Sequence, residues 1–302
     1  MHAHTPSVNP AARETAPQPL LQPLDTPAPL PVAVTALATA GDDGAARALA
    51  EARLILERRL FFAEYEPVVS LQGGQVVGFE ALARFLLPDG QAVSPNSLFA
   101  RLRGEPALLL EAEVLLKRHQ LDHAPRDGDL FVNLDPDSWA AGNAGAGPNP
   151  LLDLLGRAST RVVVEVTEAL DESDSALARE LVGVLRARGQ RYALDDVGAQ
   201  NCLLSFEALD DADVLKFDRI LLHRLGRPRR HAVVRALAEA ARATGARTVL
   251  EGIETVEDLR LASDLGVDLV QGWYFSRLCR HSPRPPSERL DRPDRAADLS
   301  SR

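Results

Sequence analysis

Short β-rich runs and longer amphipathic stretches alternate along the chain from about residue 43 to residue 279. Helices are predicted over residues 42–60 and in four stretches with hydrophobic residues at helical spacing. Several of these stretches end in Gly directly before the next run, as at Gly189, Gly245 and Gly266, which is a typical helix stop. The predicted strands are FFAEYEPVVS, QVVGFEALARF, DLFVNLD, RVVVEVTE, RYALDD, DVLKFD, RTVLEG and DLVQG.

This alternation predicts an α/β protein with a mainly parallel sheet that helices cover. Eight strands in about 240 residues match the size of a (β/α)8 TIM-like barrel. An open doubly wound sheet is the main alternative, but no G-x-G-x-x-G motif follows the first predicted strand. We therefore expect the barrel.

The two ends of the chain differ from its middle in composition. Residues 1–41 are rich in Pro, Ala and Thr, and residues 280–302 are rich in Pro and Arg, so both are predicted to be disordered. Residues 42–279 are predicted to form one folded domain. No hydrophobic run approaches the roughly 20 residues of a membrane span, and no signal peptide is recognisable. A soluble, cytoplasmic protein that does not associate with membranes is expected.

The charge and the cysteine count exclude several classes of function. The formal net charge is -9, which argues against general nucleic-acid binding because that needs a basic surface. Cys202 and Cys279 are the only cysteines, too few for a disulfide framework or a thiolate metal site. A small phosphorylated substrate stays open, since bound cations reverse the sign of the charge locally.

Polar residues stand at or near the carboxyl end of most predicted strands. A single acid at such a place is more often a helix cap or a surface residue. Acids from several strands in one barrel mouth, however, would repel one another unless a cation lies between them. Oxygen ligands without Cys or His suit Mg²⁺ or Mn²⁺. The strand-end residues are Glu80, Asn133, Glu165, Glu168, Asp195, Asp196, Lys216, Glu251 and Gln271.

Asp195 and Asp196 are adjacent, so one of them can bridge two metal ions while the other binds one. Two hard cations about 4 Å apart suit in-line attack of water on a phosphodiester. Lys216 would then hold the attacking water or stabilise the transition state. The alternative for Lys216 is a salt bridge in the barrel mouth.

Eight short blocks in this order resemble the EAL domain, the cyclic di-GMP phosphodiesterase family. They are YEPVV, GFEALARF, FVNL, VEVTE, ALDD, VLKFDR, LEGIET and QGWYFS, and the resemblance covers roughly residues 48 to 278. The resemblance implies a (β/α)8-type barrel with one antiparallel strand near its start. It also implies two Mg²⁺ or Mn²⁺ ions per active site and hydrolysis of cyclic di-GMP to the linear dinucleotide pGpG.

The resemblance also implies roles for individual residues. One metal would be bound by Glu80, Asn133, Glu165 and Asp195, and the other by Asp195, Asp196 and Glu251. Lys216, Glu251 and Glu254 are the implied catalytic residues, with Lys216 contacting the catalytic water. Glu168 would support the loop after the aspartates. Substrate would contact Leu82 of the EAL tripeptide, Arg84 as a phosphate ligand, Gln271, and Glu66.

Two departures from the family pattern are visible. Glu66 stands where the family usually has Gln, and a carboxylate there would repel substrate phosphates. The loop at residues 197–204 reads VGAQNCLL, where the family pattern is close to FGTGYSSL. The expected function is metal-dependent cyclic di-GMP hydrolysis; the alternative is a weak or inactive module that binds cyclic di-GMP or a protein. A homodimer and a regulatory protein partner are further expectations.

Overall fold

A computed structural model describes residues 42–286, except residues 146, 168–171, 200–205 and 225–227. The strands are β1 (Phe61–Ser70), β2 (Val76–Leu86), β3 (Ala92–Val93), β4 (Asp129–Asn133), β5 (Arg161–Thr167), β6 (Arg191–Val197), β7 (Val214–Phe217), β8 (Arg247–Leu250), β9 (Leu269–Val270) and β10 (Arg280–His281). The helices are α1 (Asp42–Glu57), α2 (Pro95–Leu102), α3 (Pro106–Asp122), α4 (Pro136–Gly142), α5 (Pro150–Gly156), α6 (Glu172–Ala187), α7 (Phe206–Asp211), α8 (Ile220–Arg224), α9 (Pro228–Thr244) and α10 (Val256–Leu265), with a 3-10 helix η1 (Trp273–Leu278).

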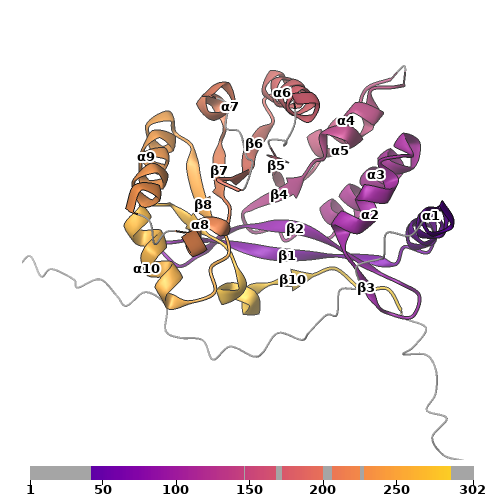
Figure 1. Ribbon diagram of the computed structural model, residues 1–302, viewed down its shortest axis with the longest axis horizontal. Coiled ribbons are helices and arrows are strands. Elements are labelled where there is room, and N and C mark those ends of the chain that lie inside the picture. The colour runs from indigo at the N-terminus through magenta and orange to yellow at the C-terminus, as the bar shows by residue number, and fades with distance from the viewer. Residues whose placement is uncertain (1–41, 146, 168–171, 200–205, 225–227, 287–302) are drawn as a thin grey trace, which may run out of the picture.

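Eight of the strands close into a barrel. From β2 through β4, β5, β6, β7 and β8 to β9, each strand pairs with the next in parallel. β1 closes the ring by pairing antiparallel with both β2 and β9. In Figure 1 the helices fan over one side of the strands, and the long β1–β2 ribbon runs across the other side. The predicted TIM-like barrel with one antiparallel strand near its start is confirmed.

The barrel interior is filled by a layer of hydrophobic side chains, one from each of seven strands. Because side chains alternate along a strand, residues two positions before and two after this layer point to the same interior. The layer consists of Val68, Phe131, Val163, Ala193, Val214, Val249 and Leu269, all at most 3% exposed. A larger hydrophobic cluster packs the helices against the outside of the strands.

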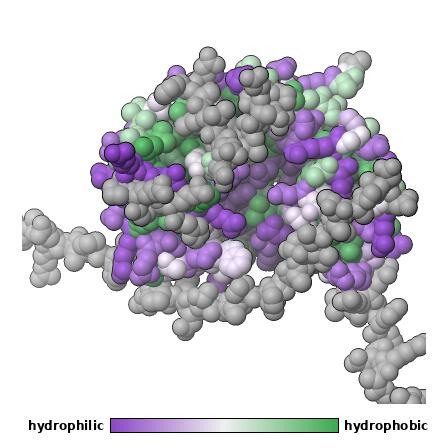
Figure 2. Space-filling view, viewed as in Figure 1, coloured by the Kyte–Doolittle hydropathy of each residue, from purple (hydrophilic) through white to green (hydrophobic). Residues whose placement is uncertain are grey.

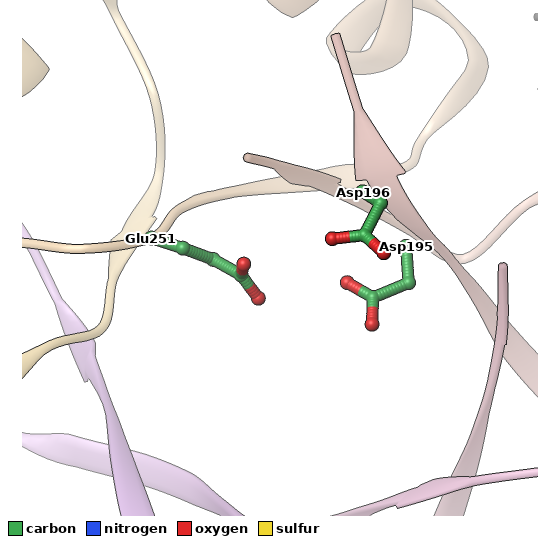
Figure 3. A group of neighbouring side chains, drawn as sticks. All are labelled: Asp195, Asp196 and Glu251. Carbon is green, nitrogen blue, oxygen red and sulfur yellow. The ribbon is translucent and has the colours of Figure 1, made fainter. Parts of the chain in front are cut away.

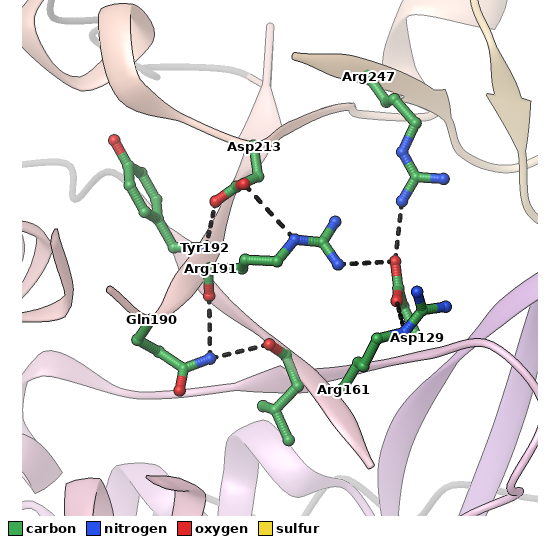
Figure 4. A network of polar contacts seen from close by, with 8 residues as sticks. Asp129, Arg161, Gln190, Arg191, Tyr192, Asp213 and Arg247 are labelled. Carbon is green, nitrogen blue, oxygen red and sulfur yellow. Dashed lines mark hydrogen bonds and ion pairs between the residues drawn. The ribbon is translucent and has the colours of Figure 1, made fainter. Parts of the chain in front are cut away.

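Two residues before the hydrophobic layer, at the amino ends of the strands, a charged cluster covers the floor of the barrel (Figure 4). Buried Asp129 begins β4 and forms ion pairs with the residues that begin three other strands. These partners are Arg161, Arg191 and Arg247, at N–O distances of 3.1, 3.0 and 2.9 Å. Asp213, just before β7, lies 3.5 Å from Nε of Arg191 and accepts a hydrogen bond from the backbone of Tyr192. Ion pairs therefore connect the amino ends of four strands at the floor of the barrel.

The carboxyl-terminal boundary differs from the predicted one. Residues 280–302 were expected to be disordered, but Arg280 and His281 form β10, antiparallel to Tyr65 and Glu64 of β1. Ser282 extends this strap: its N–H donates to the carbonyl of Ala63, and its Oγ accepts from the N–H of Ala63. Backbone pairing of this kind needs no hydrophobic side chains, so the composition gave no sign of it. Residues 1–41 and 287–302 lie outside the described residues.

Helices also differ from the pattern in number and in length. The predicted helix at residues 42–60 ends at Glu57, and the short helices α2, α4, α5, α7 and α8 lie in stretches for which we predicted none. Most have too few turns to show a clear period. No helix in the described part of the chain is long and hydrophobic enough to cross a bilayer. The face seen in Figure 2 is mainly hydrophilic around a central hollow.

Candidate active site

Two residues beyond the hydrophobic layer, at the carboxyl ends of the strands, the interior residues become polar. Phe131 is followed by Asn133, Val163 by Glu165, Ala193 by Asp195 and Val249 by Glu251 in the same alternation, as expected for one face of each strand. Lys216 of β7 follows Val214 in the same way. The mouth of the barrel is therefore a polar ring that sits directly on a hydrophobic layer, which keeps water away from its lower side.

The ammonium group of Lys216 lies at the centre of this ring. Its Nζ is 2.6 Å from Oε1 of Glu165 and 2.7 Å from Oε1 of Glu251. It is also 3.2 Å from Oε2 of Glu80 and 3.2 Å from Oδ1 of Asp195. The Lys216 side chain is 1% exposed. Four acids from four strands thus share one buried cation.

Two amides connect the carboxylates. Nδ2 of Asn133 donates to Oε1 of Glu80 at 3.1 Å and to Oε2 of Glu165 at 3.0 Å. Nε2 of Gln271, which follows β9, donates to Oε2 of Glu80 at 2.6 Å. Glu80 is thereby held by three donors, Lys216 included, which fixes the orientation of its carboxylate.

Asp195 and Asp196 point to the same side although they are neighbours in a strand. Asp196 has a φ of +56°, in the left-handed region, and the pairing of β6 with β7 shifts register between Leu194 and Val197. Asp tolerates this conformation better than most residues, and such outliers concentrate at functional sites. As a result both aspartates face Glu251 across the mouth (Figure 3), and one oxygen from each of the three acids lies within 4.8 Å of the others.

The ring carries more negative charge than Lys216 can offset. Burial, reinforced by neighbouring acids, raises the pKa of Glu165 well above its usual range and the pKa of Glu251 to about 8. Burial and Asp195 raise the pKa of Asp196 to about 6. Burial alone would lower the pKa of Lys216, but the four surrounding carboxylates raise it above its usual value. Without a further cation, simultaneous ionisation of all these acids is therefore unfavourable.

Glu80 differs from the other acids of the ring. Burial opposes its ionisation, but Lys216 and the hydrogen bonds from Gln271, Lys216 and Asn133 together hold its pKa below the usual value. Glu80 is thus the carboxylate best kept ionised in the absence of any added cation.

The donor set fits hard divalent cations. Every candidate ligand supplies oxygen, and four acids face the one cation of the ring before Asp196 is counted. Oδ1 of Asp195 and Oε1 of Glu165 face the ammonium group of Lys216, at 3.2 and 2.6 Å. A divalent ion that used these oxygens would replace their contacts with Lys216 by stronger charge-charge interactions.

The expected substrate-binding residues extend from the mouth along the β1–β2 ribbon. Glu66 lies directly opposite Glu80, and Leu82 lies opposite Glu64. Burial, with Glu80 and Glu64 nearby, raises the pKa of Glu66 to about 7. Arg84 lies four residues beyond Glu80 on the same face of β2, and its Nη2 is 2.8 Å from Oε1 of Glu64. We did not predict Glu64 as a site residue; the only signal was its two-residue spacing from Glu66.

Three predicted features lie elsewhere or outside the described residues. Glu254 is exposed in the turn before α10, and its described hydrogen bond is from its backbone N–H to Asp258. Glu168 is not among the described residues, and neither are residues 200–204 of the divergent loop. The start of that loop is described: Gly198 has a φ of +90°, which favours glycine.

The family model for the EAL domain matches residues 46–278 of this chain. The cyclic di-GMP phosphodiesterase RocR of Pseudomonas aeruginosa is 29% identical over 243 residues, which are 78% of this chain and 60% of RocR. The chain spans less than two thirds of the length of the curated relatives it matches.

Two solved structures have closely similar folds. The PaMucR phosphodiesterase in its c-di-GMP complex has a TM-score of 0.62 and 26% identity, and the match covers 81% of this chain and 99% of that chain. The YkuI protein of Bacillus subtilis, solved with substrate c-di-GMP and calcium, has a TM-score of 0.63 and 26% identity. That match covers 78% of this chain and 59% of YkuI.

Proposed function

Because the chain belongs to the EAL domain family, we propose that it is a metal-dependent phosphodiesterase that hydrolyses cyclic di-GMP to linear pGpG. The observation that carries the proposal is the ring in which four carboxyl groups face the single ammonium group of Lys216. The complexes of PaMucR and YkuI with c-di-GMP support the choice of substrate.

We assign the ligands of two Mg²⁺ or Mn²⁺ ions to the ring. Glu80, Asn133, Glu165 and Asp195 would hold one ion, and Asp195, Asp196 and Glu251 would hold the other. Such ions supply a strong nucleophile from water at neutral pH and offset negative charge on phosphoryl oxygens. Asn133 now directs its NH₂ group at two carboxylates, so its amide would have to turn over to offer Oδ1 as a ligand.

Lys216 has the central role among the remaining groups. Its three N–H donors face four carboxylates. With these acids bound to cations, an N–H of Lys216 would be free to orient the attacking water and to stabilise charge on the phosphoryl group. The same lysine offsets part of the negative charge of the ring when no other cation is present.

The substrate would lie along the ribbon beyond the ring. Arg84 is placed to bind a phosphate, Leu82 offers a hydrophobic contact, and Gln271 reaches the mouth from β9. Glu254 and Glu168 are assigned supporting roles, in catalysis and in the loop after the aspartates respectively. Glu66 faces the same space, and as a carboxylate it would weaken phosphate binding while it is ionised.

Incubation of the purified protein with cyclic di-GMP and Mg²⁺ or Mn²⁺, followed for pGpG, tests the proposal. We expect turnover with either ion and none after chelation. Asp195→Asn should abolish turnover, whereas Asp129→Asn, the same change on the barrel floor, should leave most of it. Binding without turnover by the wild-type protein would replace the enzyme with the alternative, a non-catalytic module of the same fold.

A further inference from the structure

The guanidinium group of Arg84 is already paired with an acid of the neighbouring strand. Its Nη2 lies 2.8 Å from Oε1 of Glu64, and its Nη1 donates to the backbone carbonyl of Ala83. The two side chains are 35% and 24% exposed, so the pair is partly shielded from water. The positive charge of Arg84 is therefore neutralised within the chain before any ligand arrives.

Glu64 is held in place by its surroundings. It lies directly opposite Leu82 of β2 and directly opposite His281 of β10 in the pairing of β1 with its two neighbours. Nδ1 of His281 is 3.7 Å from Oε2 of Glu64, the oxygen that does not face Arg84. The carboxyl-terminal strap thus borders Glu64 on the side away from Arg84, which limits how far the carboxylate can swing.

We propose that Glu64 competes with the substrate phosphate for Arg84 and so lowers the affinity of the site for cyclic di-GMP. This inference rests on the proposed function, because it assumes that Arg84 meets a phosphodiester. An incoming phosphate must displace Glu64 or share the guanidinium with it, and in both cases two anions compete for one cation. Glu66 lies two residues along the same face of β1 and adds negative potential there only when it is ionised.

Glu64→Gln is the informative variant. The amide is the same size and still offers an oxygen to Arg84, so the position of the guanidinium is kept while the negative charge is lost. Pairs of this exposure are worth little individually, so we expect about a fivefold lower Kd for cyclic di-GMP. Because the effect is on binding and not on the reacting groups, KM should fall by a similar factor while kcat stays unchanged.

Two further variants make the test specific. Glu257→Gln removes the same charge from exposed helix α10, where Glu257 pairs with Arg260, and controls for net charge. Glu64→Gln combined with Arg84→Gln tests whether Glu64 acts on substrate affinity through Arg84. If Glu64 acts by occupying Arg84, its removal should change nothing once Arg84 is gone.

Kd is measured by titration calorimetry with cyclic di-GMP and calcium, the ion present with c-di-GMP in the YkuI structure. KM and kcat are measured with Mn²⁺. The inference is overturned if Glu64→Gln matches Glu257→Gln, or if it tightens binding equally without Arg84. Failure of the wild-type protein to bind or hydrolyse cyclic di-GMP would instead overturn the proposed function on which the inference rests.

Discussion

The mouth and the floor of the barrel hold charge clusters of opposite sign, four residues apart along the same strands. At the mouth one lysine is surrounded by four carboxylates, and at the floor one aspartate is surrounded by three arginines. The charged side chains that are in the majority, arginines at the floor and acids at the mouth, differ in exposure. The floor arginines are 34% to 74% exposed, whereas the mouth acids that contact Lys216 are 0% to 21% exposed.

This difference in exposure separates a structural cluster from a binding site. Surplus charge at the floor is hydrated, so the cluster is complete without a ligand. Negative charge at the mouth meets little water, so the pKa values of the acids are raised and any cation that can reach them is favoured. Substitutions at the mouth and at the floor of the barrel can each test this difference.

Lys216→Met should have the largest effect, because it leaves the buried acids with no cation. At pH 8 and without divalent ions we expect a loss of about 3–5 kcal/mol in the free energy of unfolding. Turnover should fall by about 10²–10³-fold. Urea unfolding with and without Mg²⁺ measures the first effect, and Mg²⁺ should recover part of the loss. Equal stability of variant and wild type would show that Lys216 does not compensate the ring.

The next largest expected effect is a change of stability with pH that originates in the acids of the mouth. Glu251 and Asp196 have pKa values raised to about 8 and about 6 in the folded protein, so folding favours their protonated forms. The stability they contribute is complete below about pH 4 and is lost as pH rises through 6 to 8. Without metal we expect a Tm about 5 °C lower at pH 8.5 than at pH 5.5.

Saturating Mg²⁺ should flatten this dependence, because cation binding replaces the bound protons. Glu251→Gln should also flatten it in the absence of metal, since that variant has no proton to lose at this position. Thermal melts across the pH range, with and without chelator, provide the measurement. A wild-type slope that neither change reduces would place its origin outside the mouth.

Asp129→Asn on the floor should have the smallest effect. It removes the acid that three arginines share, but those arginines can turn to water, so we expect a loss of about 1–2 kcal/mol. The loss should be the same with and without Mg²⁺, and kcat should be unchanged. A larger loss that Mg²⁺ reverses would contradict the assignment of the floor as a purely structural cluster.

The barrel and the residues of the mouth could be predicted because both follow from a two-residue period. Most of the parallel strands place a hydrophobic residue and, two positions later, a polar one on the same face, as in Val163 and Glu165. Register and closure could not be predicted. The contact of Lys216 with Glu80, 136 residues earlier, exists only because the ring closes through β2.

The orientation of the two aspartates and the pairing of Arg84 with Glu64 could not be predicted from the sequence pattern either. Asp195 and Asp196 should point to opposite faces in a regular strand, and only the left-handed backbone at Asp196 brings them together. The pairing of Arg84 with Glu64 depends on the antiparallel register of β1 and β2, which sets Glu64 opposite Leu82. Both are local consequences of tertiary structure.

Counting the Mn²⁺ ions that bind at the mouth tests the central claim most directly. Titration calorimetry of metal-free protein at pH 8 should give two ions per chain, and Asp195→Asn should lose specific binding because Asp195 is assigned to both ions. Asp129→Asn should bind two ions like the wild type. No specific Mn²⁺ binding by the wild-type protein, or unchanged binding by Asp195→Asn, would contradict the account of the mouth as a two-metal site.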